Sequence, residues 1–289
     1  TFTAEITDVG SAPNDCEYTH FNSYNKSNYD IHYTYGTLKI TGRKIVVVTA
    51  DAERAYNGEA LSKTDGWQTY LYGDGAQKGL LGEDTLTLDA SATVPAITNF
   101  GTLENAVKYV ASNNYIIEEY VNGTLTVTQR EIVVTFNSAS KVYDGEALSE
   151  KGYTTYWKEN AEFKGLVGDD KLIIDDSTVP SLTDVGTETN RFDFTLPEFE
   201  EGKSNYALYE TFNGTLEVTE RTLSVATGSA TAVYSGKPLS QPQYEECYYL
   251  DADGVKQVGL VNGDQLAVLA PFSVTAVTPS TPPLPPPPP

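Results

Sequence analysis

The sequence of 289 residues predicts an all-β protein, in which small β-sandwich modules of immunoglobulin-like size follow one another in an elongated rod. Three observations lead to this prediction. Several short blocks recur along the chain in one register, and the segments between them contain β-branched or alternating runs without a helical period. The joints that connect one repeat to the next are also too short to act as flexible linkers.

The repeat is visible in two blocks that keep a common spacing. A seven-residue block that begins with Tyr occurs at 56–62, 143–149 and 234–240, so that its copies start 87 and 91 residues apart. A second block, which begins with Gly-Thr-Leu, occurs with the same spacing at 36–40, 123–127 and 214–218. Gly-Leu segments and Asn-Tyr pairs recur in the same order around these blocks. Agreement at several places in one register indicates a repeat architecture.

The register of the blocks also predicts the domain boundaries. Residues 43–129 and 130–220 are complete modules, whereas residues 1–42 match the second half of a module and residues 221–278 match a first half. Residues 279–289 hold eight prolines and predict a polyproline II tail. Because the chain contains no Met and no leader, we expect it to be a mature fragment or an excerpt of something longer.

Within the first complete module, six strands are expected at 44–49, 68–72, 84–88, 106–110, 116–121 and 124–128. The first of these runs is β-branched, and the third alternates between apolar and polar residues. Asn122-Gly123 and Asn213-Gly214 lie between strand-like runs and predict hairpins, because both residue types tolerate positive φ. No window has the apolar stripe of a helix, so a sandwich is favoured over a β-grasp arrangement, which needs one helix.

Three short joints connect the expected last strand of one repeat to the first strand of the next, at 41–43, 128–130 and 219–221. Near-continuous strands of this kind should hold neighbouring modules in line. Each joint ends on an arginine: Arg43, Arg130 or Arg221. These arginines either bridge to an acidic neighbour across the joint or are solvated charges at a strand end.

Composition excludes several classes of function. The chain has 40 acidic and 19 basic residues and a formal net charge of −21, which argues against nucleic-acid binding. No apolar run is long enough to insert into a membrane. Two His and two Cys leave few groups for a metal site or a nucleophile–base pair, and no basic residue recurs beside the carboxylates. We therefore expect no catalytic residues, no cofactor and no enzymatic activity.

The two cysteines lie in the two half-modules, whereas the complete modules contain none. Cys16 takes an apolar position where the complete modules have Val107 and Phe192, and Cys247 lies in an aromatic strand. They are either two unrelated buried thiols or a disulfide. In the second case the half-modules of neighbouring copies complete each other by strand addition, and a disulfide between Cys16 and Cys247 links the two half-modules covalently.

Acidic clusters and exposed aromatic residues give two further candidate sites. Asp169, Asp170, Asp251 and Asp253 are weak Ca²⁺ candidates, since Ca²⁺ takes six to eight oxygen ligands, but no segment fits the twelve-residue calcium loop and solvated turns are favoured. Four strand aromatics are candidates for stacking on sugar rings. These are Trp67, Tyr70, Tyr72 and Trp157. Aromatic residues in strands more often pack on cross-strand neighbours.

The ordered set of motifs resembles the MBG/YDG-type tandem repeats of bacterial cell-surface, adhesin-like proteins. The second complete module shows them at 130–135, 141–145, 165–169, 184–186, 205–206 and 213–219. The resemblance covers nearly all of the chain except the proline tail. It implies an extracellular location at a bacterial cell surface or cell wall, tandem arrays, and a stalk or adhesive role, and it brings no catalytic residues.

We therefore expect a secreted, non-enzymatic structural protein that forms a semi-rigid acidic stalk. Two alternatives remain open. In the first, strand aromatics or grooves between modules bind a glycan or a host protein. In the second, the chain is the subunit of a self-assembling filament, in which copies of the chain are its partners through their terminal half-modules.

Overall fold

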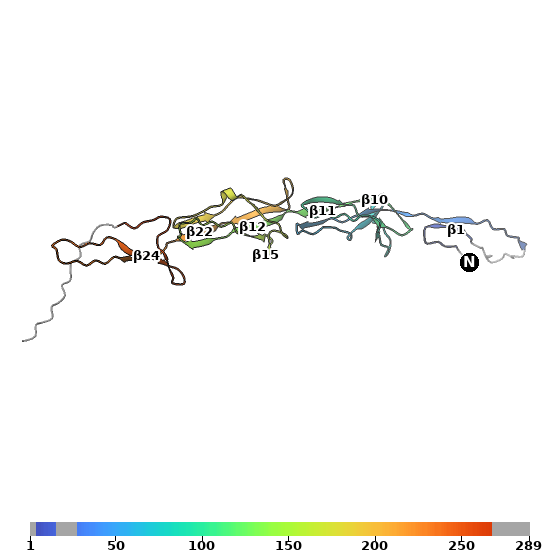
Figure 1. Cartoon of the computed structure of the whole chain (residues 1–289). Coiled ribbons are helices and arrows are strands. Elements are labelled where there is room, and N and C mark those ends of the chain that lie inside the picture. Colours follow the sequence, from blue (N-terminus) through green and yellow to red (C-terminus); the bar gives the residue numbers. More distant parts are fainter. Residues whose placement is uncertain (1–3, 16–27, 268–289) are drawn as a thin grey trace, which may run out of the picture. The chain divides into compact units, whose positions relative to one another are not determined.

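A computed structural model describes residues 4–15 and 28–267 (Figure 1). The chain falls into two compact units. Unit 1 contains the described residues up to 136 together with 152–178 and 192–212, and unit 2 contains 137–151, 179–191 and the described residues from 213 onward. Both units consist of small β-sheets. The described residues contain no α-helix, and the 3-10 turn η2 (Asp176–Thr178) interrupts the strands only briefly, so the all-β prediction is confirmed.

The strands of unit 1 are β1 (Gly10–Asn14), β2 (Gly36–Ile40), β3 (Arg43–Val48), β4 (Ala52–Ala55), β5 (Gln68–Leu71), β6 (Asp74–Lys78), β7 (Thr87–Leu88), β8 (Gly101–Asn105), β9 (Tyr109–Val110), β10 (Tyr115–Val121), β11 (Gly123–Thr128), β12 (Arg130–Phe136), β14 (Tyr153–Trp157), β15 (Asn160–Lys164), β16 (Ile173–Ile174), β18 (Phe194–Thr195), β19 (Glu198–Glu200), β20 (Lys203–Ser204) and β21 (Tyr206–Phe212). The strands of unit 2 are β13 (Ala139–Val142), β17 (Gly186–Asn190), β22 (Gly214–Thr219), β23 (Ser224–Thr227), β24 (Tyr244–Leu250) and β25 (Lys256–Val258).

The first complete repeat contains two principal sheets, with strand orders β10-β3-β5-β6 and β4-β11-β8. In the first sheet β10 pairs with β3 in parallel, and in the second β11 lies between β4, which is parallel to it, and β8, which is antiparallel. The second repeat has the same strand orders, β15-β14-β12-β21 in unit 1 and β13-β22-β17 in unit 2. No described sheet combines strands from both repeats.

The hairpins expected at the two Asn-Gly pairs are wrong. β10 and β11 flank Asn122-Gly123 but belong to different sheets, and β21 and β22, which flank Asn213-Gly214, also belong to different sheets. Glycine is needed at 123 because a Cβ atom there would lie 2.5 Å from the carbonyl oxygen of Ala50. The Asn-Gly pair thus marks the point where the chain passes from one sheet into the next.

Several strand expectations also need correction. The strand expected at 84–88 is limited to β7, and the one expected at 106–110 is replaced by β8 and the two-residue β9. β4 and β6 were not expected, because their sequences carry charged or polar residues with no clear alternation. The first repeat therefore contains nine strands, β3 to β11, instead of six.

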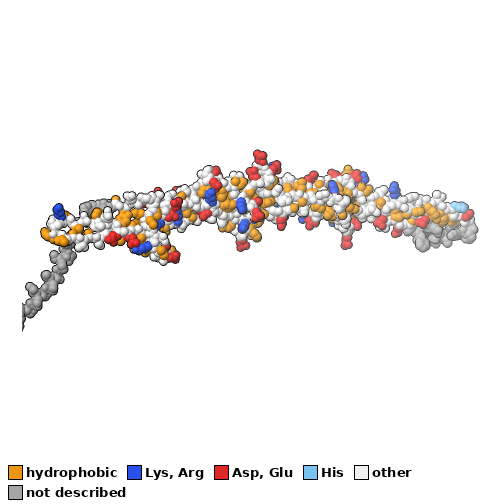
Figure 2. All heavy atoms as spheres, viewed as in Figure 1, with side chains coloured by type: hydrophobic (Ala, Val, Ile, Leu, Met, Phe, Trp, Pro, Cys, Tyr) orange, Lys and Arg blue, Asp and Glu red, His pale blue; other side chains and the backbone are white. Residues whose placement is uncertain are grey.

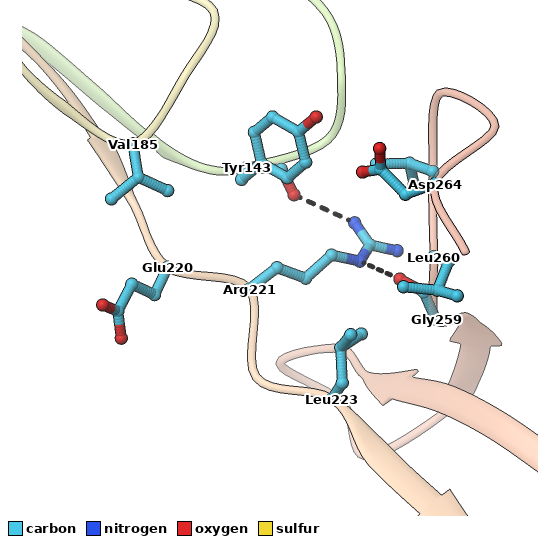
Figure 3. Close-up of a pocket in the computed structure, with 9 residues that line it drawn as sticks. Tyr143, Val185, Glu220, Arg221, Leu223, Gly259, Leu260 and Asp264 are labelled. Atoms are coloured by element: carbon cyan, nitrogen blue, oxygen red, sulfur yellow. Dashed lines mark hydrogen bonds between the residues drawn. The ribbon is translucent and has the colours of Figure 1, made fainter. Parts of the chain in front are cut away.

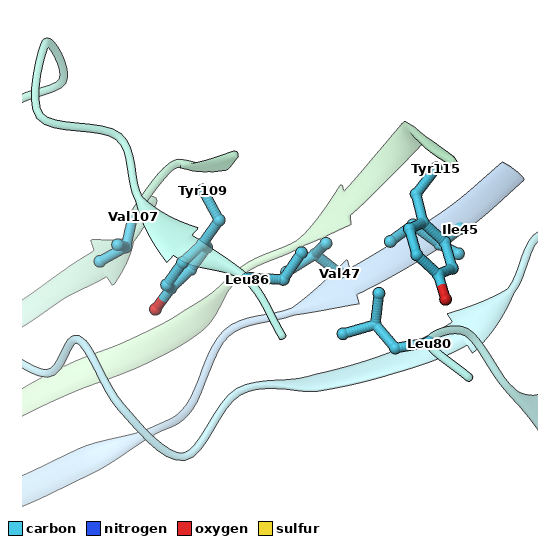
Figure 4. Packing of buried hydrophobic residues seen from close by; sticks show 7 residues of the cluster. All are labelled: Ile45, Val47, Leu80, Leu86, Val107, Tyr109 and Tyr115. Carbon is cyan, nitrogen blue, oxygen red and sulfur yellow. The ribbon is translucent and has the colours of Figure 1, made fainter. Parts of the chain in front are cut away.

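Alternate residues of β3 pack against residues of neighbouring strands and loops to form the core of the first repeat. Ile45 and Val47 are fully buried on one face of β3. Figure 4 shows them with the other buried members of the cluster, Leu80, Leu86, Val107, Tyr109 and Tyr115. The hydroxyl of Tyr109 donates a hydrogen bond to the carbonyl oxygen of Thr64 at 2.8 Å. The polar group of this buried ring is therefore hydrogen-bonded.

A buried asparagine holds the loops of each complete repeat. In unit 1 the side-chain nitrogen of Asn105 donates to the carbonyl oxygens of Ala50 at 2.8 Å and Lys63 at 3.0 Å. In unit 2 the corresponding nitrogen of Asn190 donates to Asn137 at 2.7 Å and Glu150 at 3.0 Å. Both asparagines are fully buried. Each side-chain amide therefore supplies hydrogen-bond donors to loop carbonyl oxygens that need a partner in the interior.

Acidic side chains are common on the visible face of the molecule, with fewer basic ones between them (Figure 2). None of the helices in the described residues is long and apolar enough to cross a membrane.

Candidate functional site

The joint between repeats is built around an arginine, and the same arrangement occurs three times. Arg43 and Arg130 begin β3 and β12, and Arg221 precedes β23. The Nε atoms of these arginines donate to the carbonyl oxygens of Gly79 at 2.8 Å, Gly165 at 2.7 Å and Gly259 at 2.9 Å. Their Nη2 atoms donate to the carbonyl oxygens one residue earlier, in Lys78, Lys164 and Val258.

The expected bridge to an acidic side chain is wrong for these arginines, and the expected solvated charge is wrong for Arg130. The acceptors of their hydrogen bonds in the described residues are backbone carbonyl oxygens, where a carboxylate was expected. Arg130 is also only 7% exposed, so it is not a solvated charge. Its burial lowers the pKa of the guanidinium from the usual value.

Arg130 connects the first repeat to the second within unit 1. Its Nη1 lies 3.4 Å from the carbonyl oxygen of Tyr56, a residue of the preceding repeat. The guanidinium carbon is 4.2 Å from the centroid of the Trp157 ring, which is a favourable cation–π distance. In unit 2, Arg221 has the corresponding contacts. Its Nη1 donates to the carbonyl oxygen of Tyr143 at 3.2 Å (Figure 3), and its guanidinium carbon lies 4.3 Å from the centroid of the Tyr249 ring.

The tyrosine of the Asn-Tyr pair completes the joint. Tyr206 is 1% exposed; its hydroxyl accepts a hydrogen bond from the backbone N–H of Val167 at 2.9 Å and donates to a carboxylate oxygen of Asp170 at 2.6 Å. Its ring meets that of Tyr56 edge to face, with 5.5 Å between centroids. Burial, followed by the hydrogen bond to Asp170, raises the pKa of Tyr206 well above its usual range. Tyr115 bonds in the same way to Leu81 and Asp84.

The asparagine of the pair reaches back to the preceding repeat. The side-chain oxygen of Asn205 accepts from the N–H of Phe100 at 2.7 Å, and its side-chain nitrogen donates to Asn99 at 3.1 Å. Asn114 makes the same two bonds with Val9 and Asp8, each at 2.8 Å. The pair therefore joins two repeats, because its asparagine binds the preceding repeat while its tyrosine binds the repeat that contains it.

The third copy of the joint, in unit 2, contains an open pocket. It is lined by Tyr143, Val185, Glu220, Arg221, Leu223, Gly259, Leu260, Val261 and Asp264, and Figure 3 shows the Arg221 side chain between Tyr143 and Gly259. At the joint of Arg130 the corresponding space is occupied by Asn205-Tyr206. No Asn-Tyr pair is present among the described residues of unit 2.

The structure does not bring the four candidate stacking aromatics together. Trp67 lies 6.0 Å from the Tyr109 ring against the core, and it borders a shallow pocket with Tyr70. Tyr72 is exposed, with the ammonium group of Lys44 5.9 Å from its ring centroid. Trp157 lines a different pocket, beside the joint. Two of the four thus have structural contacts with the core or with an arginine.

Two of the four acidic candidates, Asp170 and Asp251, accept hydrogen bonds from other residues of the chain. Asp170 binds the Tyr206 hydroxyl and is adjacent to Asp169 in the chain. Asp251 accepts hydrogen bonds from the Gln257 side chain and from the backbone N–H groups of Val255 and Asp253, and these bonds hold the pKa of its carboxyl below the usual value. The described part of the chain contains no group of three or more His, Cys, Asp or Glu side chains placed to hold a metal ion.

Cys247 is a free thiol on β24, opposite Val225. The corresponding positions of the complete repeats carry Thr69 and Thr155, each opposite a valine of the first strand. Cys16 lies outside the described residues, so the disulfide between Cys16 and Cys247 stays a prediction.

Comparison with models of known protein families, with curated proteins and with solved structures gives no match.

The Asn-Tyr pairs and Gly-Leu segments mark the register in the sequence, but their part in the joint was not predicted, and Asp170 was predicted only as a weak Ca²⁺ candidate. Their recurrence at constant spacing was the available signal, because residues that form one site must recur together in every copy of it. The carbonyl acceptors of the arginines had no such signal, since every residue carries a carbonyl group.

Proposed function

We propose that this chain is a non-enzymatic structural protein, an extracellular stalk of tandem β-modules at a bacterial cell surface. The observation that supports the proposal most strongly is the repeated joint. An arginine occurs at all three joints, and an Asn-Tyr pair with a buried tyrosine binds the preceding repeat through Asn114 and Asn205. These polar groups therefore form their hydrogen bonds with the chain itself. The order of motifs that resembles surface-protein repeats supports the extracellular location.

The joint inside unit 1 has the properties of a stiff connection. A single residue, Gln129, separates β11 from β12, and its side-chain nitrogen donates to the carbonyl oxygens of Ser204 at 3.0 Å and Tyr206 at 3.1 Å. A flexible linker leaves its backbone and side chains to water. Here the connecting residue is bonded to the repeat that it enters, which favours a fixed orientation of successive modules and hence an extended stalk.

Acidic surfaces support the same proposal. A formal net charge of −21 makes neighbouring parts of a tandem array repel one another. Repulsion of this kind disfavours back-folding and non-specific association, which suits a spacer that must remain extended.

Spin-label distances test the stiffness of the joint. In a chain with Cys16→Ser and Cys247→Ser, labels are attached at Gln77→Cys on β6 and Glu162→Cys on β15, two exposed positions within unit 1. We expect one narrow distance distribution from pulsed electron resonance. Arg130→Ala should broaden it, whereas Arg191→Ala, at an exposed arginine, should not. A distribution in the parent chain as broad as that of a flexible linker would refute the proposal.

The aromatic residues do not favour a second function. A glycan platform needs exposed rings on one surface, whereas the Trp157 ring is in contact with the Arg130 guanidinium and Trp67 is packed beside Tyr109.

A further inference from the structure

The last sheet of unit 2 has an open edge at β23. Its strand order β23-β24-β25 matches β12-β14-β15 in unit 1, but β12 also pairs in parallel with β21 on its other side. Among the described residues, no strand pairs with the corresponding edge of β23. An edge of this kind presents backbone N–H and C=O groups that another strand can bind.

The pocket at Arg221 is lined by residues that correspond to those around the Tyr206 side chain. Its lining residues Tyr143, Val185, Arg221, Val261 and Asp264 correspond in the repeat to Tyr56, Phe100, Arg130, Val167 and Asp170. Arg221 already makes the contacts that Arg130 makes, with Gly259, Val258 and Tyr143. The pocket is therefore formed in advance for a strand that begins with Asn-Tyr.

The residues at the start of the third tyrosine block, 234–240, are strongly exposed. Val233 is 91% exposed and Tyr234 is 95% exposed. In the complete repeats the residues just before this tyrosine form β4 or β13, which pair with β11 or β22. Residues 230–233 form no strand, although a tyrosine block follows them as it does in the complete repeats. A strand equivalent to β11 or β22 would give them a partner.

Residues 28–40 of unit 1 have the sequence and the exposure of the complementary element. They begin with Asn28-Tyr29 and end with β2, which pairs with β1 in the register of β11 with β8. β11 also pairs with β4, whereas the sheet of β2 contains only β1 and β2 in the described residues. Tyr29 is 62% exposed, compared with 8% for Tyr115 and 1% for Tyr206.

We propose that the pocket at Arg221 binds residues 28–40 of a second copy of this chain, so that two chains complete one repeat between them. This inference rests on the proposed structural function and names the partner of its joint. By correspondence with Asn205-Tyr206, Tyr29 of the second copy donates its hydroxyl proton to Asp264 and accepts from the N–H of Val261. Asn28 of that copy binds the backbone N–H of Val185.

The length of the donor strand fits this arrangement. Seven residues lead from Tyr29 to Gly36, whereas eight lead from Tyr115 to Gly123 and from Tyr206 to Gly214. The complete repeats accommodate the additional residue as a bulge, at Glu118 in β10 and at Tyr209 in β21. The shorter segment therefore pairs with β23 in the same register without a bulge.

Two single variants separate the donor from the acceptor. Tyr29→Ala removes the side chain that enters the pocket, and Asp264→Arg fills the pocket and removes the hydroxyl acceptor. The parent chain should form concentration-dependent oligomers in sedimentation velocity, and each variant alone should be monomeric. A mixture of the two should form a one-to-one dimer and nothing larger, because it contains one intact donor and one intact acceptor. Tyr72→Ala and Asp253→Arg, at exposed positions outside the interface, should behave as the parent does.

A labelled peptide of residues 28–40 provides a direct measurement. It should bind saturably to the Tyr29→Ala chain, whose pocket is intact. In that background Asp264→Arg should weaken binding at least about tenfold, because a hydrogen bond to a charged group is lost. Asp253→Arg should not. Circular dichroism checks that each variant is folded.

Three outcomes would overturn the inference. They are a parent chain that is monomeric at all concentrations, a peptide that does not bind the folded Tyr29→Ala chain, and oligomers that persist in both variants. A monomer that binds its own strand would also overturn the role of a second copy. The spin-label experiment within unit 1 does not depend on association, so a failure here leaves the proposed structural function standing.

Discussion

At the scale of single residues, Arg130 shows why arginine occupies the joint. Its planar guanidinium donates to carbonyl oxygens of Gly165, Lys164 and Tyr56 and also faces the Trp157 ring. Lysine has a point charge without the fork that aligns several donors in one plane. The joint thus depends on geometry as well as on charge.

We expect Arg130→Ala to destabilise the second repeat by about 2 to 4 kcal/mol, because charged hydrogen bonds are lost and carbonyl groups become unsatisfied. Arg130→Lys should fall between the parent and Arg130→Ala. Urea unfolding followed by Trp157 fluorescence, in a Trp67→Phe background, measures the change. Arg191→Ala, at an exposed arginine, is the control, and an equal effect of the two alanine variants would contradict the role of Arg130.

The buried hydroxyl of Tyr206 predicts a loss of stability in alkali. The pKa of Tyr206 is raised in the folded chain by burial and by the hydrogen bond to Asp170. The unfolded chain therefore releases this proton first, from about pH 10 upward, and the stabilisation present below that pH declines as the pH rises toward the folded pKa.

The melting temperature should accordingly fall above about pH 10, and Tyr206→Phe should reduce the slope of this fall. Tyr156→Phe, at an exposed tyrosine, should leave the slope unchanged. Thermal unfolding between neutral and alkaline pH gives both slopes, and identical slopes for the parent and Tyr206→Phe would exclude the assignment.

At the scale of strands and loops, the β-branched and alternating runs without a helical period allowed the all-β class to be predicted. The path of the chain at Asn122-Gly123 could not be predicted, because Asn-Gly suits both a hairpin and a passage between sheets. The close approach of Gly123 to the Ala50 carbonyl decides between them, and these residues are far apart in sequence. The same reason applies to the joint, where the arginines were found but their backbone acceptors were not.

Asn105 provides a test of how the loops of a repeat are held. Its amide donates to two carbonyl oxygens in the interior. Asn105→Asp keeps the shape but replaces the donor by a carboxylate that faces both carbonyl groups. We expect a loss of about 2 to 4 kcal/mol in the unfolding of the first repeat, because the charge is buried without a partner.

Trp67 fluorescence in a Trp157→Phe background reports on this repeat. Asn113→Asp makes the same chemical change at an exposed position and should alter stability by less than about 0.5 kcal/mol. If the two variants unfolded at the same urea concentration, the buried amide would not support the loops.

At the scale of the whole molecule, the repeats should behave as a linear array in which each repeat is stabilised by its neighbour. The contacts of Asn205 with Asn99 and Phe100, and of Tyr206 with Tyr56, join two repeats inside unit 1. Hydrogen bonds contribute about 1 kcal/mol each and an edge-to-face ring pair about 0.5 to 1.5 kcal/mol.

The segment 43–129 alone should therefore unfold at a lower urea concentration than the same segment in the full chain, with a difference of about 2 to 4 kcal/mol. Trp67 fluorescence follows this segment in both proteins when the full chain carries Trp157→Phe. In the full chain, Asn205→Ala should remove part of the difference, because it breaks the bonds to the preceding repeat and leaves the Tyr206 contacts in place. Equal stability of the isolated and the connected segment would show that the joint orients the repeats without stabilising them. A stalk that resists bending requires a joint that orients the repeats and also stabilises them.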